Sequence, residues 1–441
     1  MARRIEPARR LRGRVRAPGD KSISHRMAML SAIAEGETVI EGYLTSADCL
    51  ATLDCLARLG VSVQVTAQGV RVGGVGKSGL RPSAATLDAV NSGTTIRLLA
   101  GILAGQPFET AITGDASLRR RPMRRVIEPL RRMGATIAAV DDNLAPLVIR
   151  GGKLQGIVYE STVASAQVKS CLLLAGLFAS GETTVIEPIP TRDHTERLLG
   201  AFGVPVVVSD AARRVSGDDQ LRSPGRLRAP GDFSAAAFLL AAGLLVEDAS
   251  LCIEGVGVNP TRAGLLTVLR EAGASIEIMN ERLEGGEPVG DLSVSPATAR
   301  PRRQMRLEGA LTANAIDEIP ILSVLGAAFG GLEVADASEL RVKESDRLAL
   351  IARNLRAMGV ELEARPDGLT IPGGQRFRGA AIETAGDHRI AMAFAVAALV
   401  AEGPTFIDDP ACVSVSFPGF FTVLERLQRL GSGEEKRLAQ S

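Results

Sequence analysis

The stretch GRVRAPGDKSIS, residues 13–24, decides the organisation of this chain because the sequence contains it twice. Its second copy, GRLRAPGDFSAA, spans residues 225–236. Self-similarity at this separation is typical of a chain built from two related halves. The sequence therefore predicts two domains of similar design, each beginning beside one copy of the repeated stretch.

A shorter unit recurs three times within each half. It consists of a polar helix start, an apolar helix, a strand rich in β-branched residues, and a second helix ending in a motif such as LGV or MGA. The apolar helices are predicted at residues 24–36, 93–105, 166–181, 233–245, 318–331 and 388–403. A helix that is apolar on nearly every face must be buried, and these runs are too short to span a bilayer. We expect two α/β domains with sheets and outer helices around three buried helices.

Composition limits the classes of protein that this chain can belong to. Its 441 residues are 46% hydrophobic and only 3% aromatic, with no Trp, so we expect an aliphatic core in two or three domains. The net charge of +1 argues against a broad surface for nucleic acid or anionic membrane. Five cysteines without a C-x-x-C pair are typical of reduced thiols in a cytoplasmic protein. The Arg-rich start, MARRIEPARRLRGRVR, is expected to be a frayed tail leading into a first strand, not a targeting signal.

The polar starts of the buried helices differ between the repeats. In the fourth copy, Asp232 or Ser234 meets the ordinary need for a cap. The first copy adds more polar groups than a cap requires, and other copies begin with NSGTTIR, SAQVK, IDEIP and GDHRIAM. Helix N-termini bind anions through free N–H groups and the helix dipole. If several of these helix starts face one cleft, they would bind a molecule with several negative charges.

Other motifs have simpler interpretations. The stretch GGVGKSG, residues 73–79, is expected to be a hairpin turn and not a nucleotide-binding loop, because no suitable helix follows it. His25, His194 and His388 have no metal-ligand spacing, so no metal site is expected. The arginine-rich run around Arg121 and the Lys343–Glu344 pair are, taken singly, typical of solvated surface.

Taken together, eight motifs point to one family. GDKSISHR, NSGTTIR, RRRPM, SAQVKS, RDHTE, IDEIP, LRVKESDR and GDHRIAM occur in this order between about Leu11 and Leu430. In this respect the chain closely resembles the EPSP synthase (3-phosphoshikimate 1-carboxyvinyltransferase) family of enolpyruvyl transferases. The resemblance implies a two-domain inside-out α/β barrel in which each domain has three βαβαββ repeats around buried helices. It implies domains of residues 1–19 plus 230–441 and residues 20–229, with the active site in the cleft between them.

The resemblance also implies a reaction. Members of the family transfer the enolpyruvyl group of phosphoenolpyruvate to the 5-hydroxyl of shikimate 3-phosphate, releasing phosphate by addition and elimination through a tetrahedral intermediate. This chemistry requires no metal and no cofactor. The implied partners are the two small-molecule substrates, without nucleic acid or membrane, and the implied protein is a cytoplasmic monomer.

The resemblance assigns roles by motif. Asp317, Glu344 and Lys21 are expected to be catalytic: Asp317 as the base on the attacking hydroxyl, and Glu344 with Lys21 in proton transfer at C3. His388 is a further candidate for proton transfer. The residues expected to bind shikimate 3-phosphate are Lys21, Ser22, Arg26, Ser165, Ala166, Gln167, Asp317 and Lys343. The residues expected to bind phosphoenolpyruvate are Lys21, Gly93, Arg121, Gln167, Arg347 and Arg389.

Two departures and two alternatives stand beside this interpretation. Many members have Ser-Ser-Gln where this chain has Ser165-Ala166-Gln167, and some have a Lys where Val415 precedes SFP. The related UDP-N-acetylglucosamine enolpyruvyl transferases use a reactive Cys in a mobile loop, but the SLRRRPM region of this chain has none. A non-catalytic anion-binding protein is the alternative outside the enzymes.

Overall fold

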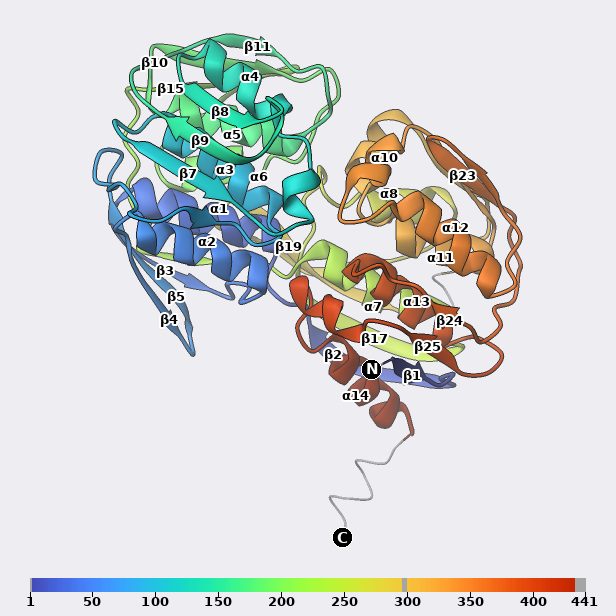
Figure 1. Cartoon of the computed structure of the whole chain (residues 1–441). Coiled ribbons are helices and arrows are strands. Elements are labelled where there is room, and N and C mark those ends of the chain that lie inside the picture. The colour runs from blue at the N-terminus through green and yellow to red at the C-terminus, as the bar shows by residue number, and fades with distance from the viewer. Residues whose placement is uncertain (1, 296–299, 433–441) are drawn as a thin grey trace. The chain divides into compact units, whose positions relative to one another are not determined.

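The computed structural model describes residues 2–295 and 300–432 (Figure 1). The chain divides into two compact units. Unit 1 contains Met1–Pro18, Gly231–Arg282 and Pro288–Ser441, and unit 2 contains Gly19–Pro230 and Leu283–Glu287. The grouping of residues 283–287 with unit 2 has no counterpart in the sequence analysis.

Unit 2 contains three four-stranded sheets of one design. In each sheet the first two strands are parallel and the later strands are antiparallel. The sheets, in strand order, are β16(Arg226–Arg228)-β3(Glu35–Glu41)-β5(Gly69–Val75)-β4(Ser62–Thr66), β6(Leu87–Asp88)-β7(Glu109–Thr113)-β9(Leu144–Arg150)-β8(Thr136–Val140) and β11(Val158–Glu160)-β13(Glu182–Ile186)-β15(Ala212–Ser216)-β14(Val207–Ser209). A short parallel pair, β10(Leu154–Gln155)-β12(Ala179–Ser180), accompanies the third sheet. The common topology confirms the three repeats.

Three inner helices fill the interior of unit 2, as their apolar sequences predict. They are α1(Lys21–Ile33), α3(Gly93–Ala104) and α5(Ala166–Gly176), and nearly all of their residues are buried. A Cβ on Gly101 would lie 2.2 Å from the carbonyl oxygen of Cys171, so glycine allows α3 and α5 to pack closely. The outer helices are α2(Ala47–Arg58), α4(Arg124–Arg132) and α6(His194–Ala201), with a 3₁₀ turn η1(Leu118–Arg120) before α4.

Within its described residues, unit 1 repeats this design with one change. Its sheets, in strand order, are β2(Arg10–Arg16)-β17(Asp248–Gly257)-β19(Glu287–Val294)-β18(Glu277–Glu284), β20(Met305–Leu307)-β21(Leu332–Val334)-β23(Gly368–Ile371)-β22(Glu363–Arg365) and β1(Arg3–Ile5)-β25(Thr405–Ile407)-β24(Ala381–Ile382). The tip of the β18–β19 hairpin is the segment Leu283–Glu287, which groups with unit 2. The last sheet has three strands instead of four.

The helices of unit 1 again form an inner and an outer set. The inner helices are α7(Phe233–Leu245), α11(Ile319–Ala328) and α13(His388–Ala398), and the outer helices are α8(Gly264–Glu271), α12(Arg347–Ala357) and α14(Phe420–Ser432). Helix α10(Gly309–Ala315) and the 3₁₀ turns η2(Ser338–Val342) and η3(Pro410–Val415) complete the unit. No single helix in the described ranges is long and apolar enough to cross a membrane; α10 and α11 pass that test only together, and they are bent by 106°.

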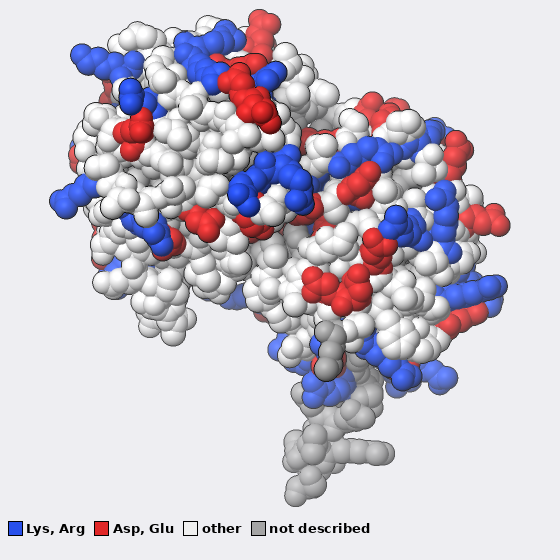
Figure 2. Space-filling model, viewed as in Figure 1, with Lys and Arg blue, Asp and Glu red and all other residues white. Residues whose placement is uncertain are grey.

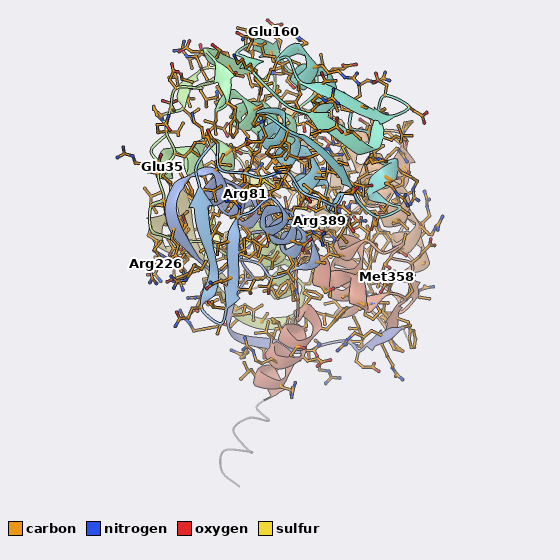
Figure 3. All side chains as sticks on the ribbon, turned by 60° about the vertical axis from the view of Figure 1, so that its left-hand side comes forward. Glu35, Arg81, Glu160, Arg226, Met358 and Arg389 are labelled. Carbon is orange, nitrogen blue, oxygen red and sulfur yellow. The ribbon has the colours of Figure 1, made fainter. Side chains whose placement is uncertain are left out.

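The two copies of the repeated stretch exchange their strands between the units. Strand β2 directly precedes α1 in the chain, but it belongs to unit 1 and pairs with β17. Strand β16 directly precedes α7, but it belongs to unit 2 and pairs with β3; Figure 3 labels Arg226 in β16 and Glu35 in β3. In four other repeats the parallel strand comes just before its own inner helix, so the exchange is confined to the two copies of GR-x-RAPGD.

Two expectations from the sequence were wrong. The start of the chain is not a frayed tail, because β1 pairs antiparallel with β25, in the sheet that lacks the hairpin found in the other repeats. The stretch 73–79 is not a hairpin turn. It completes β5 and turns into a loop, where the Lys77 ammonium donates hydrogen bonds to the carbonyls of Leu177, Gly217 and Asp219 at 2.7–3.1 Å. This lysine therefore has a structural function, clipping three backbone segments together.

Candidate active site

The inner helices of unit 2 each begin at an N-terminus capped by a side chain. Asp20 Oδ1 accepts a hydrogen bond from the Ile23 amide at 2.9 Å, and Ser92 Oγ accepts one from the Thr95 amide at 3.1 Å. At α5 the Ser165 hydroxyl lies 3.5 Å from the Val168 amide. Each cap satisfies one amide, and the remaining first-turn N–H groups have no partner within their helix. Three helix starts in one unit therefore offer anion-binding backbone groups.

Lys21 is the first residue of α1 and is largely covered. Its ammonium lies 3.1 Å from a carboxylate oxygen of Asp48 on α2, and 15% of its side chain is exposed. Ser22, the next residue, is partly buried, and its carbonyl accepts a hydrogen bond from Arg26 at 2.9 Å. The exposed part of the Lys21 side chain could contact a ligand beside the ion pair with Asp48.

Arg26 lies one turn further along α1 and is bound by neutral groups. Its Nε donates to the Thr195 hydroxyl at 2.7 Å, and Nη2 donates to the Ser170 hydroxyl at 2.8 Å. Burial lowers the pKa of Arg26 to about 10, against the smaller opposing effect of Glu196. The guanidinium therefore links α1 to α5 and α6. These hydrogen bonds go to hydroxyl groups, which carry no charge to balance that of Arg26.

The first turns of α3 and α5 are joined by side chains. Arg97 Nη1 donates to Gln167 Oε1 at 2.7 Å, and Gln167 Nε2 donates to the Thr94 hydroxyl at 3.0 Å. Arg121 donates to Asn91 at 2.5 Å. A Cβ on Gly93 would lie 2.7 Å from Arg97 Nη1 and 3.4 Å from Arg121 Nη1, so two guanidinium groups surround this glycine. Arg97 is the last residue of the NSGTTIR motif, and the sequence analysis assigned it no role.

Within unit 2 the structure thus brings together most of the residues singled out from the sequence. We call this set the unit 2 cluster; it consists of Lys21, Ser22, Arg26, Gly93, Arg121, Ser165, Ala166 and Gln167. All of them lie at or beside the N-terminal ends of α1, α3 and α5, except Arg121, which follows η1. That the helix starts of both halves face one cleft stays a prediction.

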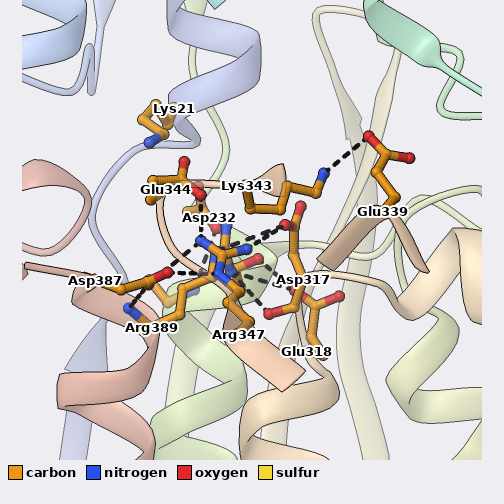
Figure 4. A network of polar contacts seen from close by, with 12 residues as sticks. Lys21, Asp232, Asp317, Glu318, Glu339, Lys343, Glu344, Arg347, Asp387 and Arg389 are labelled. Atoms are coloured by element: carbon orange, nitrogen blue, oxygen red, sulfur yellow. Dashed lines mark hydrogen bonds and ion pairs between the residues drawn. The ribbon is translucent and has the colours of Figure 1, made fainter. Parts of the chain in front are cut away.

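Arg347 organises the candidate residues of unit 1 (Figure 4). Its Nε donates to Asp387 at 2.8 Å, Nη1 to Asp317 at 3.2 Å, and Nη2 to Glu344 at 2.6 Å. Burial lowers the pKa of Arg347, but the Asp387, Glu344 and Asp317 carboxylates raise it more, and the net shift is upward. The same guanidinium holds the pKa of Asp387 below its ordinary value, although burial opposes this shift. Arg347 and Asp387 are therefore both charged near neutral pH.

Arg389 and Lys343 complete the candidate residues of unit 1. Arg389 Nη1 donates to the Asp317 carbonyl at 3.2 Å, and its Nε lies 3.8 Å from the Asp317 carboxylate. The Lys343 ammonium lies 3.4 Å from Glu339. Lys343 and Glu344 have 24% and 25% of their side chains exposed, respectively, so both could contact a ligand. We call Asp317, Lys343, Glu344, Arg347 and Arg389 the unit 1 cluster.

Three residues support the unit 1 cluster that the sequence analysis gave no role there. Asp387 is fully buried, caps α13, and accepts hydrogen bonds from Ser345 and Arg347. Arg262 Nη1 contacts both carboxylate oxygens of Glu318 at 2.9 and 3.0 Å. Sequence signals existed for Asp387 and Glu318, since GDHR repeats the Gly-Asp start of the first and fourth copies and IDEIP carries a second carboxylate. No sequence signal connected Arg262 to Glu318, because their contact is non-local.

Nucleophilic cysteine and metal chemistry find no prepared site in the described part of the chain. All five cysteines are free thiols, and burial raises the pKa of each, to about 12 for Cys55, Cys171 and Cys412. A thiol with such a pKa is a poor nucleophile near neutral pH. No group of three or more His, Cys, Asp or Glu side chains among these residues has a metal-binding arrangement.

Figure 2 shows positive and negative side chains mixed over the visible face.

Comparison with known proteins gives consistent matches. A family profile described as "EPSP synthase (3-phosphoshikimate 1-carboxyvinyltransferase)" matches residues 5–424. A 3-phosphoshikimate 1-carboxyvinyltransferase of Desulforamulus reducens is 50% identical over 96% of this chain and 98% of its own, and one of Alkalilimnicola ehrlichii is 52% identical over 94% and 93%. An EPSP synthase structure from Acinetobacter baumannii has a TM-score of 0.86 with 42% identity over 97% of this chain and 98% of its own. The enolpyruvyl transferase NikO of Streptomyces tendae, at 18% identity and a TM-score of 0.79 over 96% of each chain, shares the fold.

Proposed function

Because this chain belongs to the EPSP synthase (3-phosphoshikimate 1-carboxyvinyltransferase) family, we propose that it transfers the enolpyruvyl group of phosphoenolpyruvate to the 5-hydroxyl of shikimate 3-phosphate and releases phosphate. Family membership makes it a transferase of the shikimate pathway with the inside-out two-domain α/β fold. The observation that carries the residue roles is the network around Arg347, which gathers Asp317, Glu344 and Asp387 beside Arg389.

The reaction proceeds by addition and then elimination. Glu344, helped by Lys21, gives a proton to C3 of phosphoenolpyruvate while the 5-hydroxyl oxygen of the acceptor bonds to C2. Asp317 accepts the proton of that hydroxyl. In the elimination a methyl proton of C3 returns to Glu344, the C2–O bond to phosphate breaks, and a C2–C3 double bond forms again. The leaving phosphate takes up the proton that Asp317 accepted. Proton transfer of this kind by a positioned carboxylate typically contributes about 10²–10⁴-fold to the rate.

The partial exposure of the two carboxylates supports these roles. The Asp317 side chain is 12% exposed and that of Glu344 is 25% exposed, whereas Asp387 is closed off from solvent. A ligand can therefore reach Asp317 and Glu344, while Asp387 fixes the position of Arg347. Arg347 and Arg389 bind phosphoenolpyruvate by forked hydrogen bonds, together with Lys21, Gly93, Arg121 and Gln167 of the other unit.

Shikimate 3-phosphate uses both clusters in this proposal. Its carboxylate meets Ser22 and Arg26, and its phosphate meets the α5 start at Ser165, Ala166 and Gln167. A backbone N–H at Ala166 replaces the hydroxyl that many relatives have there. Lys21, Asp317 and Lys343 contact the remaining polar groups of the ring. The open helix N-terminus at α5 and the partly uncompensated charge of Arg26 support this assignment.

The test is phosphate release by the purified chain with phosphoenolpyruvate and different acceptors. With shikimate 3-phosphate we expect steady phosphate release and a product whose mass equals that of the acceptor plus an enolpyruvyl group. With UDP-N-acetylglucosamine we expect none. Release only with the sugar nucleotide, or binding of both substrates without turnover, would contradict the proposed function.

The proposal also places the two sets of residues in one interdomain cleft. We assign the domains as residues 1–19 plus 230–441 and residues 20–229, supported by the two compact units. Cations on both sides repel each other until anions arrive, so shikimate 3-phosphate should draw the domains together. Small-angle scattering should show a smaller radius of gyration with shikimate 3-phosphate than with shikimate alone; equal radii would contradict closure. Sedimentation tests the proposed monomer, and the free thiols support a cytoplasmic location.

A further inference from the structure

His25 is a buried titratable residue that the proposed reaction does not use. It lies in α1 among residues with assigned roles, and it is 0% exposed. Lys21 and Arg26 on the same helix belong to the unit 2 cluster, whereas His25 points to other partners. A buried histidine side chain normally has a hydrogen-bond partner.

A chain of hydrogen bonds leads from His25 to the start of α3. His25 Nδ1 lies 2.7 Å from the Thr52 hydroxyl of α2, which lies 2.7 Å from the Thr95 hydroxyl of α3. The Thr95 hydroxyl donates to Ser92 Oγ at 2.7 Å, and Ser92 is the N-cap of α3. All four side chains are buried, with at most 1% exposure. The chain therefore connects three helices through neutral groups only.

The direction of these hydrogen bonds defines the state of the histidine. Since the Thr95 hydroxyl donates to Ser92, it must accept from Thr52, and Thr52 must accept from His25 Nδ1–H. Burial lowers the pKa of His25 well below 6.5, and the charges of Lys21 and Arg26 lower it further. The ring is therefore neutral, with its proton on Nδ1. Its Nε2 is buried without a hydrogen-bond partner in the described structure.

We propose that His25 is a positioning residue that orients the first turn of α3 through Thr52, Thr95 and Ser92. Gly93 directly follows Ser92, and Arg97 lies one turn later, where it holds Gln167. This turn is the part of unit 2 assigned to phosphoenolpyruvate, so the inference rests on the proposed function. Buried hydroxyls that lose a partner leave unsatisfied polar groups, and the helix start would shift to satisfy them.

Asparagine and glutamine at position 25 separate this role from simple packing. An Asn side chain places its amide N–H near the position of His Nδ1, whereas Gln places its amide near Nε2. His25→Asn should therefore keep the donor to Thr52, and His25→Gln should lose it although Gln is closer in size. Thr52→Val breaks the same chain at the next link. Thr183→Val is the matched control, because Thr183 is a buried threonine of unit 2 that takes no part in these hydrogen bonds.

The measurements are KM values for each substrate and amide hydrogen exchange of the segment 92–97. For His25→Gln and Thr52→Val we expect the KM for phosphoenolpyruvate to rise about tenfold, as loss of one buried hydrogen bond implies. The KM for shikimate 3-phosphate should stay within about twofold, because Arg26 uses Thr195 and Ser170 instead. Exchange in the segment 92–97 should be faster in both variants and unchanged in His25→Asn and Thr183→Val.

Two outcomes would overturn the inference. The first is faster exchange and a raised KM in His25→Asn equal to those in His25→Gln, which would show that ring volume matters and not the donor. The second is unchanged exchange in both His25→Gln and Thr52→Val. A wild-type chain without turnover would contradict the proposed function instead, and the exchange measurement would still decide on the hydrogen-bond chain.

Discussion

Arg26 in unit 2 and Arg347 in unit 1 are both buried guanidinium groups, yet their surroundings are opposite. Arg26 donates to a carbonyl and two hydroxyls, and burial lowers its pKa to about 10. Arg347 donates to three carboxylates, and their charges raise its pKa. The same residue type therefore lies in two different electrostatic surroundings. In the proposed function both arginines bind substrate anions, and Arg347 in addition holds three carboxylates in place.

This difference extends to the two clusters. The unit 2 cluster combines helix N-termini with hydroxyls, amides and cations, which are groups suited to binding anions. The described hydrogen bonds of Arg26 go to uncharged groups. The unit 1 cluster joins cations to carboxylates, and two of those carboxylates are partly exposed. We infer that unit 2 mainly supplies substrate affinity and unit 1 mainly supplies proton transfer. Changes in unit 2 should then alter KM, and changes in unit 1 should alter kcat.

The largest expected effect follows from removing a carboxylate of unit 1. Asp317→Asn should lower kcat by about 10²–10⁴-fold, because the base on the attacking hydroxyl is lost. Initial rates of phosphate release measure this, with Glu333→Gln as a surface control in the same unit. A kcat within about twofold of wild type would reassign the base and remove the proposed division between the units.

Removing the two arginines should destabilise the units unequally. Arg347→Met leaves Asp387 buried without its ion partner, which typically costs about 3–5 kcal/mol. Arg26→Met removes hydrogen bonds to neutral groups, and the unsatisfied partners cost about 1–3 kcal/mol. Urea unfolding followed by circular dichroism measures both. Equal losses of unfolding free energy in the two variants would show that the carboxylates around Arg347 do not make its removal more costly than that of Arg26.

At acid pH the difference in free energy of unfolding between wild type and Arg347→Met should become smaller. The pKa of Asp387 is lowered in the folded protein, so its stabilising contribution is present above the ordinary value of 3.8 and is lost as pH falls through the lower folded value. The variant lacks that contribution at every pH. If this difference in free energy of unfolding stays constant as pH falls, Arg347 does not stabilise the protein through its ion pair with Asp387.

A steric change in unit 2 should affect one substrate. Gly93→Ala adds a Cβ 2.7 Å from Arg97 Nη1, so the guanidinium must move. The end of this side chain can move, but it then loses its hydrogen bond to Gln167, which is worth about 1 kcal/mol, and we expect the KM for phosphoenolpyruvate to rise about fivefold. The KM for shikimate 3-phosphate should change much less. Steady-state kinetics with each substrate varied in turn would reveal an equal effect on both, which would contradict separate subsites.

The smallest expected effect is a pH dependence of shikimate 3-phosphate affinity. In the proposed function an anion binds the protonated form of Arg26, so its contribution is complete well below pH 10 and is lost as pH rises through the pKa of about 10. The advantage of wild type over Arg26→Gln should fall about fourfold between about pH 8 and about pH 10.5. Calorimetry of both proteins measures this ratio. A constant ratio would show that Arg26 does not hold the substrate carboxylate.

Much of the fold and of the candidate site could be predicted from local sequence. The inner helices were predictable because a segment apolar on every face has only the interior to occupy. The polar residues at their starts were predictable because they exceed what capping requires, as the comparison of Lys21 with the plain fourth copy shows. The partners of Arg26, and the pairing of Arg262 with Glu318, were not predictable, because these contacts join distant segments.

By itself, the sequence determined six repeats, their buried helices and the capped helix starts, because these depend on residues within one turn or one strand of each other. Tertiary structure alone decided which strands β2 and β16 pair with, that β1 adds a strand to the sheet of the last repeat, and that residues 283–287 group with unit 2. It also decided which buried arginine meets carboxylates and which meets hydroxyls. Sheet pairing and burial of charge depend on surfaces that only the folded chain brings together, so no local pattern specifies them.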